Sequence, residues 1–299
     1  MAETDPRKPC RRSRHPVLFV TGGSGVIGHN LLRHLAGAGF DVVALQRRAG
    51  LDATACRVVH GDVRDFSPSW LDGIDTVVLL AAVTVPVGGE RHMRSVNVDG
   101  TRALVNAVKA CGRPVHVICT SSVAAFGPSG PANAICSDGV PHPITTYGRT
   151  KLEAEQALAS LDAASVVRLP MVTGGGDRVA ARLERMAAAR VFPVSPARFS
   201  AIDVRDVCAL VAHLADRGPG RALHTVSDGA VYDWRFLADA YERRLGRRLF
   251  KPPIPQALLQ PFLFRLLGNA DAAFYLGHDW VVRPDFPDFF HPMHGAFPS

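Results

Sequence analysis

The 299-residue sequence has no apolar run that approaches the roughly 18 residues a helix needs to cross a bilayer. Residues 1–16 are polar and basic, without the apolar stretch of a secretory signal peptide. The six cysteines are scattered and include no C-x-x-C pair, which argues against a disulfide framework and against a zinc site. These absences favour a cytoplasmic protein with reduced thiols and no membrane partner.

Three further absences exclude whole classes of function. The sequence contains no G-x-S-x-G motif, so serine-hydrolase chemistry is not expected. The pair His291 and His294 is separated by Pro292 and followed by no carboxylate, so no metal site is expected. The net charge is +7, but five of the cations lie in residues 1–15, which we expect to form a disordered basic leader: Arg7, Lys8, Arg11, Arg12 and Arg14. Because no nucleic-acid reader motif accompanies the charge, we expect no nucleic-acid partner.

Apolar strand-like runs alternate with helical patterns along the rest of the chain, which is typical of an α/β protein with a parallel sheet. The pattern predicts strands at 17–21, 41–45, 57–60, 76–81, 115–120 and 165–169. It predicts helices near 26–38, 90–111, 146–161, 178–189, 205–217, 234–245 and 255–267. We therefore expect a Rossmann-type doubly wound sheet from residues 16–170 plus about 199–228. A smaller, mostly C-terminal substrate-binding part would comprise residues 171–198 plus 229–299.

The first strand is followed by a glycine-rich turn and then a helix, in the sequence VLFVTGGSGVIGHNLLRHLAGA at 17–38. Gly22 would allow a tight exit from the strand, and Gly25 would let a diphosphate approach the backbone. Gly28 would let the helix pack closely on the strand. The helix N-terminus then presents free N–H groups to an anion. The turn therefore predicts a dinucleotide site.

Two positions bear on which dinucleotide is bound. A site selective for NAD usually has an acidic residue after the second strand, but here Arg47 and Arg48 follow it. These arginines could pair with a 2′-phosphate, so NADP is favoured and NAD remains possible. The alternative is a solvated turn. Asp62, after the third strand, is placed to bond the adenine amino group or, alternatively, to cap a short helix.

Tyr147 and Lys151 lie four residues apart in a predicted helix, so both side chains share one face. A lysine ammonium near a phenol favours phenolate and lowers the tyrosine pKa toward neutrality. The tyrosine could then exchange a proton while hydride moves to or from a nicotinamide. Ser122, at the end of the preceding strand, could donate to the substrate oxygen. The alternatives are an ordinary surface contact for the pair and a strand-closing serine.

Taken together, these segments resemble the extended short-chain dehydrogenase/reductase family, also called the NAD-dependent epimerase/dehydratase family. The matching pieces, in order over about residues 17–245, are TGGSGVIG (21–28), GDVRD (61–65), AAVT (81–84), NVDGT (97–101), TSSVAAFG (120–127), YGRTK (147–151), RLPMVTGGG (168–176) and IDVRDV (202–207). The resemblance implies that Ser122 orients the substrate, Tyr147 is the acid/base and Lys151 holds the nicotinamide ribose.

The same resemblance implies further binding residues. The cofactor would be lined by Thr21, Gly22, Gly25, Val26, Ile27, Gly28, Asp62, Val63, Ala81, Ala82, Asn97 and Pro170, in addition to Tyr147 and Lys151. Asn97 would support the central helix near the ribose, and Pro170 would abut the nicotinamide. The helices at 90–111 and 146–161 would pair across a homodimer.

The sequence departs from sugar-nucleotide epimerases of this family at two substrate positions. No asparagine follows Arg168 closely, and Phe199 stands where an arginine is often found. These departures favour a less polar carbonyl or alcohol as the small-molecule substrate, in a pocket lined by Thr84, Ser122, Met171, Val172, Phe192 and Phe199. For the four apolar side chains of that set, the alternative is core packing.

Three functions follow from these expectations. The first is an NADP(H)-dependent oxidoreductase acting on a secondary alcohol or ketone. The second is a nucleotide-sugar epimerase or dehydratase that uses a tightly bound cofactor transiently. The third is a non-catalytic dinucleotide-sensing protein, which would have little need for Ser122, Tyr147 and Lys151 together.

Overall fold

The computed structural model describes residues 15–47, 56–84, 88–130, 133–174, 178–254 and 276–290. Its centre is a seven-stranded, wholly parallel sheet in the order β10-β6-β5-β4-β1-β2-β3. The strands are β1 (Leu18–Thr21), β2 (Val42–Gln46), β3 (Arg57–His60), β4 (Thr76–Leu79), β5 (His116–Ser122), β6 (Ala164–Leu169) and β10 (Ala222–Thr225). This arrangement confirms the predicted Rossmann-type fold.

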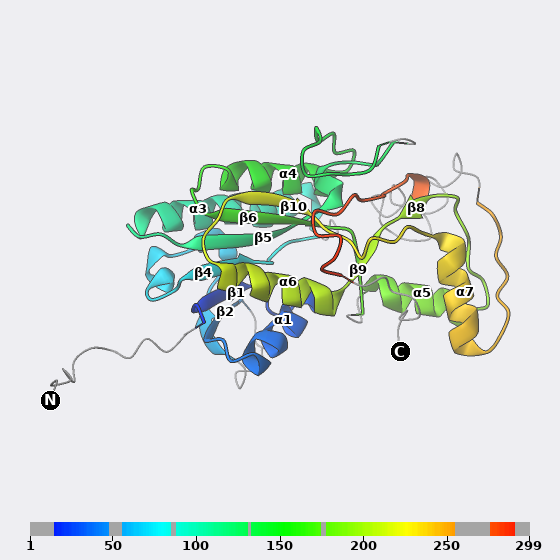
Figure 1. The fold of residues 1–299 in the computed structure, drawn as a ribbon, viewed down its shortest axis with the longest axis horizontal. Coiled ribbons are helices and arrows are strands. Elements are labelled where there is room, and N and C mark those ends of the chain that lie inside the picture. Colours follow the sequence, from blue (N-terminus) through cyan, green and yellow to red (C-terminus); the bar gives the residue numbers. More distant parts are fainter. Residues whose placement is uncertain are drawn as a thin grey trace, which may run out of the picture.

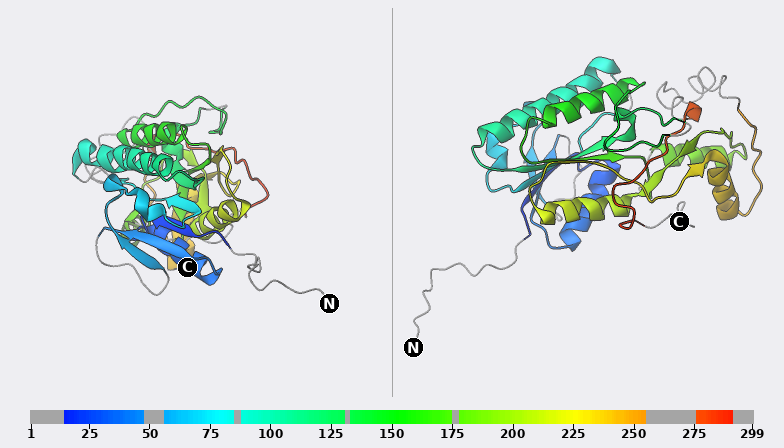
Figure 2. Two further views of the ribbon diagram at one scale, coloured as in Figure 1. Left: turned by 90° about the vertical axis from the view of Figure 1, so that its left-hand side faces the viewer. Right: turned by 45° about the horizontal axis from the view of Figure 1, so that its top comes forward.

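Helices cover both faces of the sheet, as Figure 1 and both views of Figure 2 show. One face carries α1 (Val26–Gly37) and α6 (Val204–Arg217), and the other carries α3 (Gly100–Ala110) and α4 (Thr146–Leu158). Successive side chains of β1 enter the two cores in turn: Leu18 and Val20 pack on the α1 and α6 side, and Phe19 packs on the other. This period of two is what burial on both faces of a strand requires.

The predicted helix at 90–111 is divided into three pieces. Regular helix α2 (Gly89–Arg94) passes into a π-helical turn (Ser95–Asp99) and then into α3. Short 3₁₀ turns lie at Val63–Asp65, Pro68–Leu71 and Val123–Ala125. The helix predicted at 255–267 lies outside the described residues.

A smaller lobe lies beside the carboxyl ends of the strands (Figures 1 and 2). It contains α5 (Arg178–Ala188), α7 (Trp234–Leu245) and the short strand pairs β7 (Met171–Thr173) with β9 (Ala201–Asp203) and β8 (Arg198–Phe199) with β11 (Tyr232–Asp233). Its core combines aliphatic side chains with several aromatic rings, including Phe192, Phe199, Tyr232 and Trp234. The division of the chain into two parts at the residues given above stays a prediction.

The segment at 276–290 is an ordered arm, drawn in red in Figure 1. Trp280 pairs with Phe199 of the smaller lobe and Val282 pairs with Ile135, both as isolated bridges. Phe290 then enters the core beneath α6. The arm therefore joins the smaller lobe to the sheet. At the other end of the chain, His15, the last residue of the predicted leader, pairs with Asp216, and residues 1–14 lie outside the described part.

No helix among the described residues is long and apolar enough to cross a bilayer. The same residues hold no group of three or more potential metal ligands. The described cysteines, Cys56, Cys111, Cys119, Cys136 and Cys208, are free thiols. Burial raises the pKa of the Cys208 thiol to about 12, so this group stays protonated at neutral pH.

Candidate functional site

The strand order places most of the predicted site residues along one edge of the sheet. All seven strands run in parallel, so their carboxyl ends meet at that edge, and the chain reverses its strand order between β1 and β4. Ligands of doubly wound sheets bind at this kind of switch point. The residues brought to this edge are Gly22 after β1, Arg47 after β2, Asp62 after β3, Ala81 after β4, Ser122 at the end of β5 and Pro170 after β6.

The turn after β1 leaves no space for side chains at two of its glycines. Gly22 has φ +73°, and a Cβ there would lie 2.7 Å from the Ala81 nitrogen, so the predicted tight exit is confirmed. A Cβ on Gly28 would lie 2.2 Å from the Gly22 oxygen. The prediction for Gly28 therefore needs a correction: the helix approaches the turn itself, because the turn folds back over the start of α1.

Gly25 is the exposed N-cap of α1 and supplies no side-chain acceptor to the first-turn N–H groups. A diphosphate could satisfy these donors, since a helix N-terminus also favours negative charge. The tight glycine contacts and the uncapped helix fit the group that the sequence predicts here. Val26 and Ile27, in the same first turn, are half-buried.

Thr21 fixes the two central strands to each other at this edge. Its buried Oγ1 accepts hydrogen bonds from the Leu80 and Ala81 nitrogens, each at 3.2 Å. Ala81 and Ala82 are half-buried, and Thr84 is exposed. The predicted cofactor role of Thr21 is thus accompanied by a structural one.

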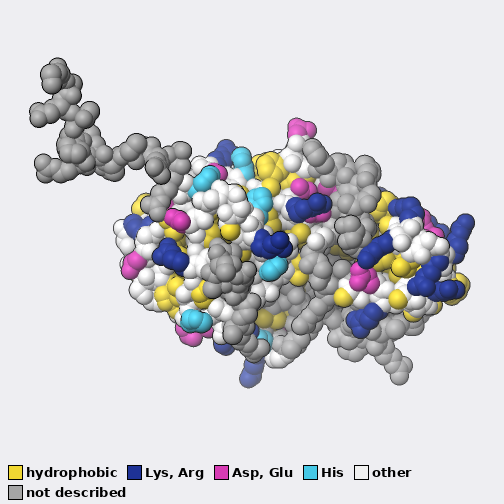
Figure 3. Space-filling view, turned by 90° about the horizontal axis from the view of Figure 1, so that it is seen from below, with side chains coloured by type: hydrophobic (Ala, Val, Ile, Leu, Met, Phe, Trp, Pro, Cys, Tyr) yellow, Lys and Arg dark blue, Asp and Glu magenta, His cyan; other side chains and the backbone are white. Residues whose placement is uncertain are grey.

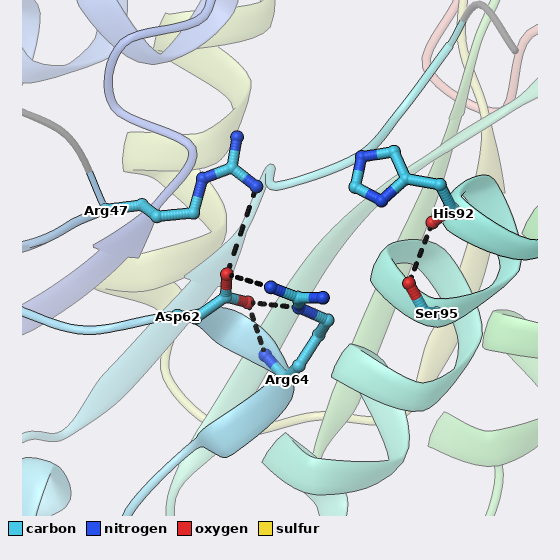
Figure 4. A network of polar contacts seen from close by, with 5 residues as sticks. All are labelled: Arg47, Asp62, Arg64, His92 and Ser95. Atoms are coloured by element: carbon cyan, nitrogen blue, oxygen red, sulfur yellow. Dashed lines mark hydrogen bonds and ion pairs between the residues drawn. The ribbon is translucent and has the colours of Figure 1, made fainter. Parts of the chain in front are cut away.

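Asp62 is held between two arginines at the end of β3 (Figure 4). Its Oδ1 accepts from the Arg64 backbone nitrogen at 3.0 Å and from Nε at 2.9 Å, and Oδ2 accepts from Nη2 at 2.8 Å. Arg47 Nη1 lies 3.9 Å from the same Oδ2. Hydrogen bonds from the Arg64 side chain, opposed by burial, lower the pKa of Asp62 to about 2.

This cluster combines one permanent carboxylate with two guanidinium groups. Asp62 also caps the short 3₁₀ turn that begins at Val63, which is the alternative considered for it in the sequence. Val63 is buried beneath α3. Arg64 was not predicted as a site residue. Its position in GDVRD, two residues after Asp62, is the sequence signal that could have identified it. Arg48 lies outside the described residues.

Lys151 is the most constrained of the predicted catalytic side chains. It is only 6% exposed, and its Nζ donates a 2.7 Å hydrogen bond to the Thr120 carbonyl of β5. Tyr147 lies one turn earlier on α4 and is half-buried. Ser122 ends β5, and its Oγ accepts a 3.2 Å bond from the Ala124 nitrogen. The lysine therefore reaches back to the strand that ends in Ser122.

Asn97 connects the loop after β4 to the helix that carries Tyr147. Its Oδ1 accepts from the Val83 nitrogen at 2.7 Å, and its Nδ2 donates to the Val83 oxygen and to Thr150 Oγ1, each at 3.0 Å. Thr150 Oγ1 donates in turn to the Tyr147 carbonyl at 2.8 Å. The π-helical turn carries Asn97 into this position, which agrees with the predicted supporting role near α4.

A buried ion pair that lies beneath these residues was not predicted from the sequence. Arg168 donates to both oxygens of Glu155, from Nε at 3.0 Å and from Nη2 at 2.7 Å. Ser121 Oγ donates to the same carboxylate, and the guanidinium lies 5.8 Å from the centre of the Phe126 ring. The signal was present: Arg168 interrupts an apolar strand, and Glu155 continues the four-residue spacing of Tyr147 and Lys151.

The predicted substrate-binding residues fall into two groups. Met171 and Val172 are half-buried in β7, just after the buried Pro170. Phe192 is 0% and Phe199 4% exposed, and both pack in the core of the smaller lobe. For these two rings the structure favours the core-packing alternative, because a fully enclosed ring offers little surface to a ligand.

Comparisons with known proteins bear on the family. The model of the NAD dependent epimerase/dehydratase family matches residues 18–224. Sterol demethylase protein B of Methylococcus capsulatus is 32% identical over 220 residues, which cover 67% of this chain and 66% of that protein. Ceramide reductase of Caulobacter vibrioides is 29% identical over 308 residues, covering 95% and 89% of the two chains.

Among solved structures, MoeE5 in complex with UDP-glucuronic acid and NAD superposes with a TM-score of 0.68. It is 26% identical, and the match covers 79% of this chain and 85% of MoeE5. The chain therefore belongs to the NAD dependent epimerase/dehydratase family, as its motifs predicted, and is an NAD(P)-dependent enzyme of the short-chain dehydrogenase/reductase superfamily.

Proposed function

We propose that this enzyme transfers hydride between NADP(H) and a secondary alcohol or ketone of a small molecule. The observation that carries the proposal is the placement of Lys151, buried at the end of β5 and one helical turn from Tyr147. Tyr147 and Lys151 lie four residues apart on α4, so both side chains project from the same face of the helix. Tyr147 would therefore present its hydroxyl to the substrate oxygen beside the lysine and exchange a proton with it.

The residues at the sheet edge fit a dinucleotide. The uncapped turn at Gly22 to Gly28 would hold the diphosphate, Asp62 would face the adenine, and Lys151 would hold the nicotinamide ribose. Arg47, half-exposed and only loosely paired with Asp62, would bind a 2′-phosphate. When bound, the dinucleotide supplies or accepts the hydride.

The protein's own groups then manage the substrate oxygen. Ser122 Oγ accepts from the Ala124 nitrogen, so its hydroxyl proton is available to donate to that oxygen. Tyr147 gives a proton to the same oxygen in reduction and takes it in oxidation. Asn97 and Thr150 hold α4 against the loop after β4, which keeps Tyr147 at this edge.

A less polar carbonyl compound is the proposed substrate class. Met171 and Val172 follow Pro170 at this edge, and two relatives carry the names sterol demethylase protein B and ceramide reductase. The alternative is a nucleotide-sugar epimerase or dehydratase, to which the UDP-glucuronic acid complex of MoeE5 points. The third candidate function is a non-catalytic dinucleotide sensor. A chain that binds dinucleotide but converts none of the tested compounds would favour it.

The test is NADPH oxidation with a panel of lipid-like ketones, compared with a panel of nucleotide sugars. We expect net NADPH consumption with a ketone, and a loss of about 10²–10⁴-fold in kcat in Tyr147→Phe that is much larger than any loss of NADPH affinity. Conversion of a nucleotide sugar without net redox change would favour the alternative. Full activity in Tyr147→Phe would show that the acid/base assignment is wrong.

We also propose that α3 and α4 pair across a homodimer, as the family resemblance implies. Light scattering of the purified chain should then give twice the mass of 32.1 kDa. A charge-reversing substitution at the exposed Arg102 of α3 should weaken that dimer, and a monomeric wild-type chain would refute it.

A further inference from the structure

One end of the smaller lobe combines exposed apolar side chains with arginines. We call this surface the basic tip; its residues are Arg190, Val191, Arg243, Leu245, Arg248 and Phe250. Phe250 is 68% exposed, and Val191 and Leu245 are about equally exposed at 41% and 40%. Large apolar side chains grouped at this level of exposure are a mark of an interaction surface.

Backbone hydrogen bonds hold two apolar residues of the tip, Val191 and Phe250, side by side. Val191 and Phe250 form an isolated parallel bridge. The Phe250 nitrogen donates to the Arg190 oxygen, and the Phe192 nitrogen donates to the Phe250 oxygen, each at 2.9 Å. Phe192 is buried in the lobe, so the exposed pair is anchored to the core.

Arg190 has an unusual backbone conformation. Its φ is +61°, and it is the one residue other than glycine with a positive φ among those that the structure describes. Glycine takes this conformation after a helix without strain, whereas an arginine there is disfavoured. The Arg190 nitrogen donates to the Ala187 oxygen and the Val191 nitrogen donates to the Met186 oxygen, so this conformation closes the end of α5 and places Arg190 directly before the exposed Val191.

The arginines of the tip are available to a partner. The neighbouring Arg244 is paired with Glu184, and Lys251 is paired with Asp239 and Glu242. Arg190, Arg243 and Arg248 are exposed and have no ion pair with any residue of the described ranges. The tip therefore carries three exposed arginines outside any ion pair of the described ranges, together with three exposed apolar side chains.

The position of the tip suits contact with an extended surface. Helix α7 lies at the right-hand end of the long axis in Figure 1, away from the sheet. Seen from below, Lys and Arg side chains gather over the same end in Figure 3, with apolar atoms between them.

We propose that the basic tip docks on the surface of an anionic lipid bilayer. Phe250, Val191 and Leu245 would enter the boundary between headgroups and acyl chains, and the arginines would pair with lipid phosphates. Aliphatic side chains gain little free energy from contact with a nucleic-acid backbone. A water-soluble polyanion is therefore the weaker candidate for the partner of this surface. The expectation of no membrane partner rested on the lack of a spanning segment, and surface binding needs none. This inference does not depend on the proposed function.

The test is cosedimentation of the full chain with phosphatidylcholine vesicles that contain or lack phosphatidylserine. We expect binding only with phosphatidylserine, weakened about fivefold by Arg248→Gln or Arg243→Gln, since each cation near a membrane contributes about 1 kcal/mol. Phe250→Ser should weaken binding about tenfold through the loss of apolar burial. The matched control is Arg33→Gln, an exposed arginine on α1, which should change nothing.

Three outcomes would overturn the proposal. The first is no binding to anionic vesicles. The second is binding that the tip substitutions leave unchanged, which would place the contact elsewhere in the chain. The third is binding that is lost in the arginine variants but kept in Phe250→Ser and is competed by heparin, which would indicate a polyanion site. Circular dichroism of each variant establishes that these exposed substitutions leave the fold intact.

Discussion

Replacing Glu155 with alanine should be among the most damaging single changes outside the dinucleotide turn. The Glu155 and Arg168 side chains are 8% and 2% exposed, and two hydrogen bonds join them. Removing one partner of a buried ion pair leaves an uncompensated charge and costs about 3–5 kcal/mol. Folded domains have only about 5–15 kcal/mol of stability in total. We therefore expect the melting temperature to fall by on the order of 10 °C.

The assay is chemical and thermal unfolding of Glu155→Ala beside a matched surface variant, Glu153→Ala. Glu153 lies on the same helix and also pairs with an arginine, Arg94, but those side chains are 29% and 46% exposed. Breaking an exposed pair costs about 0–1 kcal/mol. The double variant Glu155→Leu with Arg168→Met should recover most of the lost stability, because an apolar pair replaces the charges. Equal losses in Glu155→Ala and Glu153→Ala would refute this reasoning.

Three other changes test the dinucleotide edge. Gly28→Ala should destabilise the chain by about 1–3 kcal/mol and weaken NADPH binding, because the new Cβ would meet the Gly22 oxygen. The control is Gly37→Ala, whose new Cβ would have no atom within 4 Å and which should stabilise the chain slightly in the same unfolding assay. Arg47→Gln should weaken NADPH binding at least about tenfold and leave NADH binding unchanged by calorimetry, whereas equal losses would contradict a 2′-phosphate contact. Folding lowers the pKa of Asp62 from 3.8 to about 2. The ionised Asp62 therefore stabilises the folded state above pH 3.8, and this stabilisation is lost as the pH falls through about 2. An NMR titration should show that pKa rising toward 3.8 in Arg64→Ala; no change would remove Arg64 as the cause.

The central strands could be predicted from sequence because each is an uninterrupted apolar run. Strand β3 begins and ends at the predicted residues, and the ends of β1, β2 and β5 differ by one or two. Strand β10 was not predicted because it has only four residues and follows closely after Gly218 and Gly220. Its pairing with β6 is what defines it as a strand. The order of the strands follows from the fold class and not from any local signal.

The divided helix and the buried ion pair show what local patterns cannot reveal. The apolar periodicity of residues 90–111 is helical throughout. The π-helical turn within it carries Asn97, which forms hydrogen bonds to Val83 and Thr150 in other parts of the fold, and a local pattern does not show such tertiary contacts. Arg168 stands out within an apolar strand and Glu155 continues the spacing of Tyr147 and Lys151, but only the packing of the strand against the helix shows that the two side chains pair. The positions of Phe192 and Phe199 were likewise decided by packing, since an aromatic ring suits a pocket wall and a core equally well.

The most direct test of the account is a structure of this chain with NADPH bound. We predict the diphosphate on the turn at Gly22 to Gly28, the 2′-phosphate against Arg47, and the nicotinamide beside Tyr147 and Lys151. A nicotinamide bound away from α4, or a Tyr147 phenol directed away from it, would contradict the central claim.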